Sequence, residues 1–274
     1  MAARASTERN RRGVNRVRRG LGTAAVLALL GGGLIGACGS SEEPNGNSAD
    51  AQPFWDVAPG PGGGAAAIAS EWYESLRSMT SAADLVVRAR PGAVRPGPSL
   101  DPDPSRVDGD LYEGLLVSAI VELEPIEILA GDPPTGPIDL KLTLGFDKEI
   151  DFAEEIRELE NAEPEEGIYF LRSGTVLAEI SQNPVDDEVA RGNYTVQPSA
   201  GLVVDRGGEA VFPGLESYEE EAARDSVAAD LAGEVYADVL EAVTAEADWR
   251  RRNPAAAEAE RERMLERFYV APVT

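Results

Sequence analysis

The chain has 274 residues, and its 25 basic and 49 acidic side chains give a formal charge of −24, with no histidine and one cysteine. These absences exclude Ser-His-Asp and Cys-His nucleophilic sites, zinc sites built from His or Cys, and intramolecular disulfides. The two lysines, Lys141 and Lys148, complete neither a Ser-x-x-Lys dyad nor a phosphate-binding G-x-x-x-x-G-K loop. We therefore expect a protein that is not an enzyme and has no cofactor.

Residues 1–37 have the layout of a signal peptide, with seven arginines followed by an apolar run from Leu21 to Ala37. The run ends in Leu34-Ile35-Gly36-Ala37-Cys38. This ending resembles the bacterial lipobox, whose cysteine is diacylated and becomes the new N-terminus. The resemblance implies a lipoprotein anchored through Cys38 to the outer face of the cytoplasmic membrane. A buried thiol or an uncleaved membrane anchor is the alternative, and the general and twin-arginine export routes both stay open.

The exported part of the chain is strongly acidic. Residues 1–37 hold seven arginines and one glutamate, so their removal changes the formal charge from −24 to −30. Nucleic acid and anionic lipid headgroups repel such a body. We therefore expect no nucleic-acid partner, and we expect the acyl chains on Cys38 to make the contact with the membrane.

Residues 38–65 are rich in Ser, Glu, Asn, Pro and Gly, which predicts a disordered tether in which Phe54 and Trp55 are the large aromatic groups. A single folded domain is predicted over residues 66–252. Its first element is a helix over residues 66–80, because apolar residues recur there at helical spacing. The expected buried face of this helix consists of Ile68, Trp72, Leu76 and Met79.

Short apolar segments separated by Gly, Pro and acidic turns follow, a pattern that predicts an antiparallel barrel or sandwich. A strand over residues 85–90 ends at Pro91-Gly92, and an exposed loop continues to residue 110. A long strand over residues 111–128 has a bulge or break at Pro125. Residues 147–166 are expected to form a loop with a helical turn. The other predicted strands cover residues 138–144, 167–171, 175–180, 194–196, 202–204 and 210–212, the last two joined by a hairpin turn at Arg206-Gly207-Gly208.

Three stretches in this order carry a family resemblance: Ala83 to Ala89, Val121 to Asp132, and Glu165 to Arg172. They resemble the OB-fold-like domains of secreted actinobacterial proteins, which are distant relatives of the tissue inhibitors of metalloproteinases. The resemblance covers about residues 83–212 and implies a five-stranded barrel. Ala130 stands where that family has a basic residue, and the N-terminal cysteine of the inhibitors is used here for lipidation, so inhibitor activity is not implied.

The C-terminal part is predicted to be helical. Ser217 and Glu220 form a capping box that opens one long helix, and Asn253-Pro254 ends it after Arg250-Arg251-Arg252. Its apolar stripe is expected to pack on the barrel, with a partner helix as the alternative, and consists of Val227, Leu231, Val235, Val239 and Val243. Residues 253–274 are expected to form a loosely docked helical tail. The fold class is therefore α+β, mainly β with flanking helices: a small antiparallel OB-like barrel or sandwich and a long C-terminal helix.

Acidic residues raise the question of cation binding. Asp101, Asp103, Asp108 and Asp110 lie close together. An EF-hand loop begun at Asp101 needs Gly and Glu where Arg106 and Tyr112 stand, so no metal site is predicted.

We expect a lipid-anchored extracytoplasmic module of the cell envelope, with a binding or structural role toward a protein or another envelope component. The alternative is a carboxylate-based envelope hydrolase or a cation-dependent binding protein, which would have a deep cleft lined by two or more buried acids.

Overall fold

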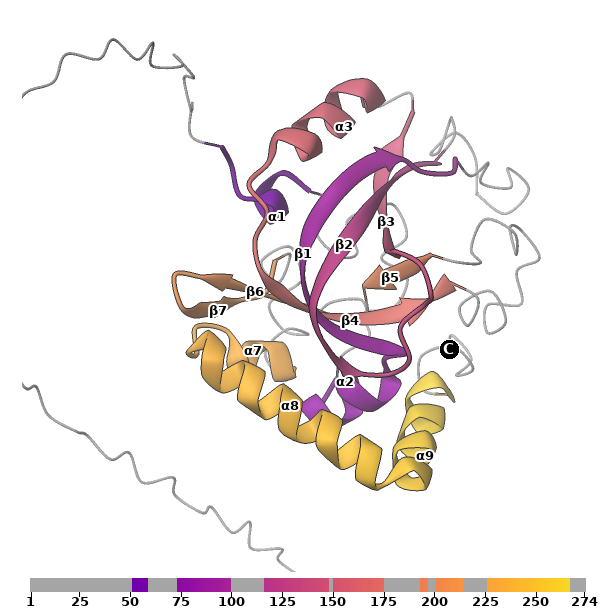
Figure 1. Ribbon diagram of the computed structural model, residues 1–274, viewed down its shortest axis with the longest axis vertical. Helices are drawn as coiled ribbons and strands as arrows, with labels where there is room; N and C mark the ends of the chain where they lie inside the picture. Colours follow the sequence, from indigo (N-terminus) through magenta and orange to yellow (C-terminus); the bar gives the residue numbers. More distant parts are fainter. Residues whose placement is uncertain are drawn as a thin grey trace, which may run out of the picture. The chain divides into compact units, whose positions relative to one another are not determined.

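The computed structural model has a β-sheet that closes on itself (Figure 1). Its strand order is β1-β2-β3-β5-β4-β6-β7, and β1 also pairs with β4, so five strands form a closed barrel. The structure describes residues 51–58, 73–99, 116–147, 150–174, 193–196, 201–213 and 226–266. All of them belong to one compact unit, Ser48–Thr274.

The barrel has the strand order of an OB-fold and confirms the predicted fold class. Strands β3 and β5 are parallel, and the other pairs are antiparallel. The strands are β1 (Leu85–Pro96), β2 (Leu116–Ala130), β3 (Ile138–Phe146), β4 (Gly167–Ser173), β5 (Tyr194–Val196), β6 (Leu202–Arg206) and β7 (Glu209–Val211).

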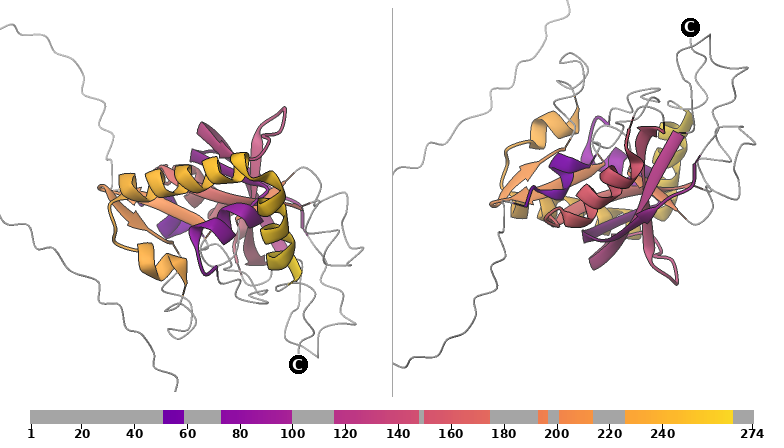
Figure 2. Two further views of the ribbon diagram at one scale, coloured as in Figure 1. Left: turned by 90° about the horizontal axis from the view of Figure 1, so that it is seen from below. Right: turned by 90° about the horizontal axis from the view of Figure 1, so that it is seen from above.

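Helices lie at one end of the barrel and on its outer surface. They are α1 (Phe54–Val57), α2 (Leu76–Ala82), α3 (Phe152–Asn161), α7 (Val227–Leu231), α8 (Tyr236–Arg252) and α9 (Pro254–Leu265). Helices α1 and α3 pack against the apolar barrel interior. Helices α2, α7, α8 and α9 form a second apolar cluster on the outer side of β1 and β4, and Figures 1 and 2 show α8 running across the body with α9 turning off at its end.

Strands β1 and β4 separate these two clusters, because side chains alternate between the two faces of a strand. In β4, Tyr169 and Leu171 point into the barrel, whereas Ile168 and Phe170 contact the helices. All four side chains are buried. Burial on both faces explains why this strand is a continuous apolar run rather than an alternating one.

Several local predictions are confirmed. Arg88 pairs with Glu127 and Ala89 with Pro125, so Ile126 is the extra residue of a bulge beside the proline. Strand β3 alternates as expected, with Leu140 and Leu142 buried. The β6–β7 hairpin turns at Gly207 and Gly208, which have φ values of 66° and 90°.

Two predictions in the middle of the chain are wrong. Strand β1 does not end at Pro91-Gly92 but continues to Pro96, because a register shift between Pro91 and Val94 accommodates the proline within the pairing with β2. The segment expected to be a loop with one helical turn contains the ten-residue helix α3. Asp151 caps this helix by accepting a hydrogen bond from the Glu154 N–H at 3.2 Å.

The tether prediction is wrong for residues 51–58. Phe54 and Trp55 are only 2% and 4% exposed and close the barrel interior from helix α1. The Phe54 N–H donates to the Glu163 carbonyl at 2.8 Å, and Trp55 Nε1 donates to the Tyr169 hydroxyl at 3.3 Å. These two aromatic side chains supply the apolar area that holds the short segment in place.

The helix boundaries also differ from those expected. Helix α2 begins at Leu76, where Ser75 caps it, so the prediction of one unbroken helix over residues 66–80 is wrong at residues 73–75. Ile68 and Trp72 lie outside the described residues. The long C-terminal helix is interrupted between α7 and α8, where Gly233 has a φ of 82°. Val235 is therefore 53% exposed, although Val239 and Val243 are buried as predicted. The predicted capping box, Ser217 and Glu220, lies outside the described residues.

Helix α9 belongs to the folded unit and is not a loosely docked tail over its length. Met264 is fully buried in the outer cluster. Arg261 Nη2 donates to Asp84 Oδ1 at 2.7 Å, which connects α9 to the residue before β1. The predicted end of the preceding helix at Asn253-Pro254 is confirmed, with Pro254 at the first turn of α9.

Candidate functional site: an arginine-lined pocket

The residues singled out for lipidation and cation binding lie outside the described part of the chain. This applies to Cys38 and to the four aspartates between residues 101 and 110. Within the described ranges, no group of three or more acidic residues has the geometry to hold a metal ion. Nor does any helix of that part have the length and apolar character needed to cross a membrane.

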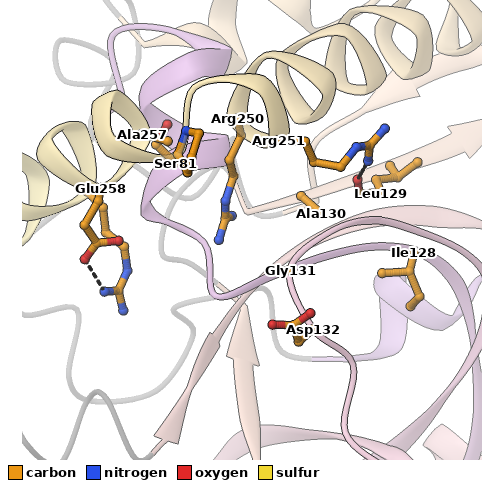
Figure 3. A pocket seen from close by; sticks show the side chains of 12 residues that line it. Ser81, Ile128, Leu129, Ala130, Gly131, Asp132, Arg250, Arg251, Ala257 and Glu258 are labelled. Carbon is orange, nitrogen blue, oxygen red and sulfur yellow. Dashed lines mark hydrogen bonds and ion pairs between the residues drawn. The ribbon is translucent and has the colours of Figure 1, made fainter.

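A pocket of about 380 Å³ lies where the α8–α9 corner meets the end of β2 (Figure 3). Three arginines and two acidic residues line it, together with small and apolar side chains. The lining residues are Ser81, Ile128, Leu129, Ala130, Gly131, Asp132, Arg250, Arg251, Pro254, Ala257, Glu258 and Arg261.

Two backbone features shape this pocket. Asn253 and Pro254 change the direction of the chain, so the last turn of α8 and the first two turns of α9 face the same space. Gly131 has a φ of 87° at the end of β2, and a Cβ there would lie 2.1 Å from the Asp84 carbonyl oxygen. Only glycine allows this close approach between the end of β2 and the start of β1.

Arg250 is the central cation of the pocket. Its Nη1 donates to the carbonyl oxygens of Thr80 at 2.9 Å and Ala83 at 2.8 Å. These carbonyls are at the C-terminal end of α2, where helix carbonyls lack partners in their own helix. Arg250 thus joins α8 to α2, and no carboxylate among the described residues forms an ion pair with it.

The other two arginines are neutralised differently. Arg251 Nη1 donates to the Leu129 carbonyl at 2.8 Å, and its Nη2 contacts Asp248. Arg261 is paired with Asp84 at 2.7 Å and with Glu258 at 3.3 Å. Asp84 Oδ2 also accepts from the Ser173 N–H at 2.8 Å. Arg261 is therefore fixed by one well-shielded carboxylate and one exposed carboxylate.

The electrostatics of the pocket follow from this arrangement. Burial lowers the pKa of Arg250, and the neighbouring Arg261 lowers it further, while Asp84, Glu258 and Asp132 oppose the shift. Loss of water around a cation is costly unless an anion or good hydrogen-bond acceptors replace it. The two carbonyl oxygens that accept from Arg250 Nη1 replace only part of the water that the guanidinium group loses on burial.

The pocket has donors for an oxyanion but lacks a catalytic arrangement among its lining residues. Guanidinium groups bind carboxylate and phosphate oxygens through charged hydrogen bonds. Asp132 and Glu258, its two acids, are exposed at the rim. The buried Ser81 Oγ has no hydrogen-bond partner in the described part of the chain, and no base in the lining contacts it. These features fit a binding site better than a hydrolytic cleft with buried acids.

The sequence pattern indicated the arginines but not their role. Arg250 and Arg251 precede the predicted helix end at Asn253-Pro254, and they lie in the last turn of α8, where basic residues complement the helix dipole. Ser81, Gly131 and Arg261 gave no local signal of a shared site. A run of three arginines in a strongly acidic chain was the available signal.

Comparison of the chain with protein-family models, with curated proteins and with solved structures finds no match.

Proposed function

We propose that the protein is a lipoprotein, anchored through Cys38 to the outer face of the cytoplasmic membrane, that binds a component of the cell envelope and performs no catalysis itself. The observation that carries this proposal is the order of signals at the N-terminus: a basic segment, an apolar run, and the single cysteine of the chain directly after Leu34-Ile35-Gly36-Ala37.

The folded body supports the proposal in two ways. Among the described residues, both apolar clusters are built from position 54 and onward, after the proposed signal peptide. From Cys38 to the first described residue, Ala51, the chain can span at most about 45 Å, because an extended residue covers about 3.5 Å. An acylated Cys38 would therefore keep the barrel close to the membrane.

Metabolic labelling with a fatty-acid analogue tests the anchor. The Cys38→Ala variant should lose the label and leave the membrane fraction, whereas Ser40→Ala, a change two residues further on, should keep both. Labelled Cys38→Ala protein would contradict the proposal. Loss of the label without release from the membrane would show that another segment holds the protein there.

A further inference from the structure

We propose that the pocket around Arg250 binds a small organic anion whose carboxylate or phosphate group pairs with this arginine. The inference names the ligand class for the binding role proposed above. It depends on the folded body alone, so it can be tested separately from the lipid anchor.

The first argument is the incomplete partnering of Arg250. Its guanidinium group carries five N–H donors, but the two hydrogen bonds that it makes to described residues both come from Nη1. The other lining arginines each have a carboxylate partner in the structure. Figure 3 shows the Arg250 side chain directed into the pocket, between Glu258 and Asp132. An anion in this space would complete the hydrogen bonding of a partly buried cation.

The second argument is the size and lining of the pocket. About 380 Å³ is within the range of small-molecule sites. Ile128, Pro254 and Ala257 provide apolar contact beside the arginines. The lining therefore fits an anionic group attached to a compact apolar portion better than a bare inorganic ion.

The third argument concerns selectivity. The chain carries 49 acidic against 25 basic side chains, so its overall field repels anions with many charges. Asp132 and Glu258 at the rim oppose the approach of a ligand with many negative charges. The structure thus favours a ligand with one or two negative charges over a polyanion.

Calorimetric titration of the full chain in non-ionic detergent tests the proposal. The probes are inorganic phosphate, acetate and butanoate, with chloride at the same ionic strength as the reference. At least one oxyanion should bind more tightly than chloride, and butanoate should bind more tightly than acetate if the apolar lining contributes. Comparison of the affinity for phosphate with the affinities for acetate and butanoate identifies which anionic group the site prefers.

Two pocket variants and one control locate the binding. Arg250→Gln should weaken it about tenfold or more, because a charged hydrogen bond is lost. Glu258→Gln should strengthen it about fivefold, because a competing negative charge is removed. Arg263→Gln is the control, since Arg263 is also on α9 but pairs with Glu260 and does not line the pocket.

Three results would overturn the proposal. The first is the absence of any oxyanion binding above the chloride reference. The second is binding that Arg250→Gln and Glu258→Gln both leave unchanged. The third, should Arg250→Gln fail to fold, is an unchanged affinity in Glu258→Gln. None of these results would alter the labelling of Cys38, so failure of this site and failure of the anchor are distinguishable.

Discussion

The barrel interior and the helical layer outside it are held together in different ways. The interior is apolar and aromatic, with Trp55 and Tyr169 in tilted ring contact at a centroid distance of 6.0 Å. The helical layer has its own apolar cluster, but arginines also attach its helices to backbone and carboxylate oxygens. Arg77 pairs with Glu246 at 2.9 Å and lies over the Trp249 ring, and Arg250 reaches two carbonyls of α2.

This difference shows how a small barrel is enlarged by helices with little apolar surface of their own. Helix α8 buries Tyr236, Val239, Val243 and Ala247, of which only three are larger than alanine. Hydrogen bonds from Arg250 and Arg251 add directional contacts that hold the C-terminal end of α8 against α2 and β2. We therefore expect substitutions that remove buried side-chain volume to destabilise the barrel interior most. In the helical layer, substitutions that remove arginine hydrogen-bond donors should destabilise most.

The largest expected effect is at Trp55. Trp55→Ala should lower the free energy of unfolding by about 3–5 kcal/mol, the usual cost of removing a buried aromatic side chain. Trp249→Ala is the matched control, because Trp249 is only partly buried in the helical layer. Chemical denaturation measures both changes. Equal costs for the two tryptophans would contradict the burial of Trp55 in the barrel.

A smaller effect is expected at Arg250. Arg250→Gln should cost about 1–3 kcal/mol, because two carbonyl acceptors at the end of α2 lose a charged donor. Arg252→Gln should change stability by less than about 0.5 kcal/mol, since Arg252 is exposed and donates its hydrogen bond to the Asp248 carbonyl of its own helix. Denaturant midpoints of the two variants give the comparison, and similar values would show that the carbonyl contacts contribute little.

The smallest effect is a loss of stability at alkaline pH. Burial raises the pKa of Tyr169 in the interior and of Tyr236 in the helical layer. A tyrosine that ionises near pH 10 only when unfolded stabilises the fold fully below that pH and loses this contribution above it. At pH 11, the ionisation of each tyrosine in the unfolded state should have lowered the free energy of unfolding by about 1.4 kcal/mol. Tyr169→Phe and Tyr236→Phe should each flatten the decline, and stability that stays constant to pH 11 would contradict the prediction.

The barrel was largely predictable because its signals are local. Alternating residues marked β3, Pro125 marked the bulge in β2, and Gly207-Gly208 marked the hairpin. Each of these features depends on the geometry of a few consecutive residues. The closure of the barrel followed from the family resemblance and is seen in the β1–β4 pairing.

The remaining features depend on contacts between distant parts of the chain. Helix α1 has four residues between prolines and glycines, so its order is explained by contacts with distant residues such as Glu163 and Tyr169. Gly233 interrupts a sequence that otherwise keeps an apolar stripe. The pocket joins residues 81, 128–132 and 250–261, and no periodicity relates these three segments.

Helix α1 has a mechanical consequence if the chain is anchored at Cys38 as proposed. Among the described residues, a pull between the membrane and the body would act first on the Pro53–Glu163 bridge and on the ion pair of Asp56 with Arg206, the last residue of β6. These contacts would have to break before α1 could leave the barrel. Detachment of α1 would then expose Tyr169 and open that end of the barrel. Tension on the lipid anchor would therefore disturb the packing of the apolar barrel interior.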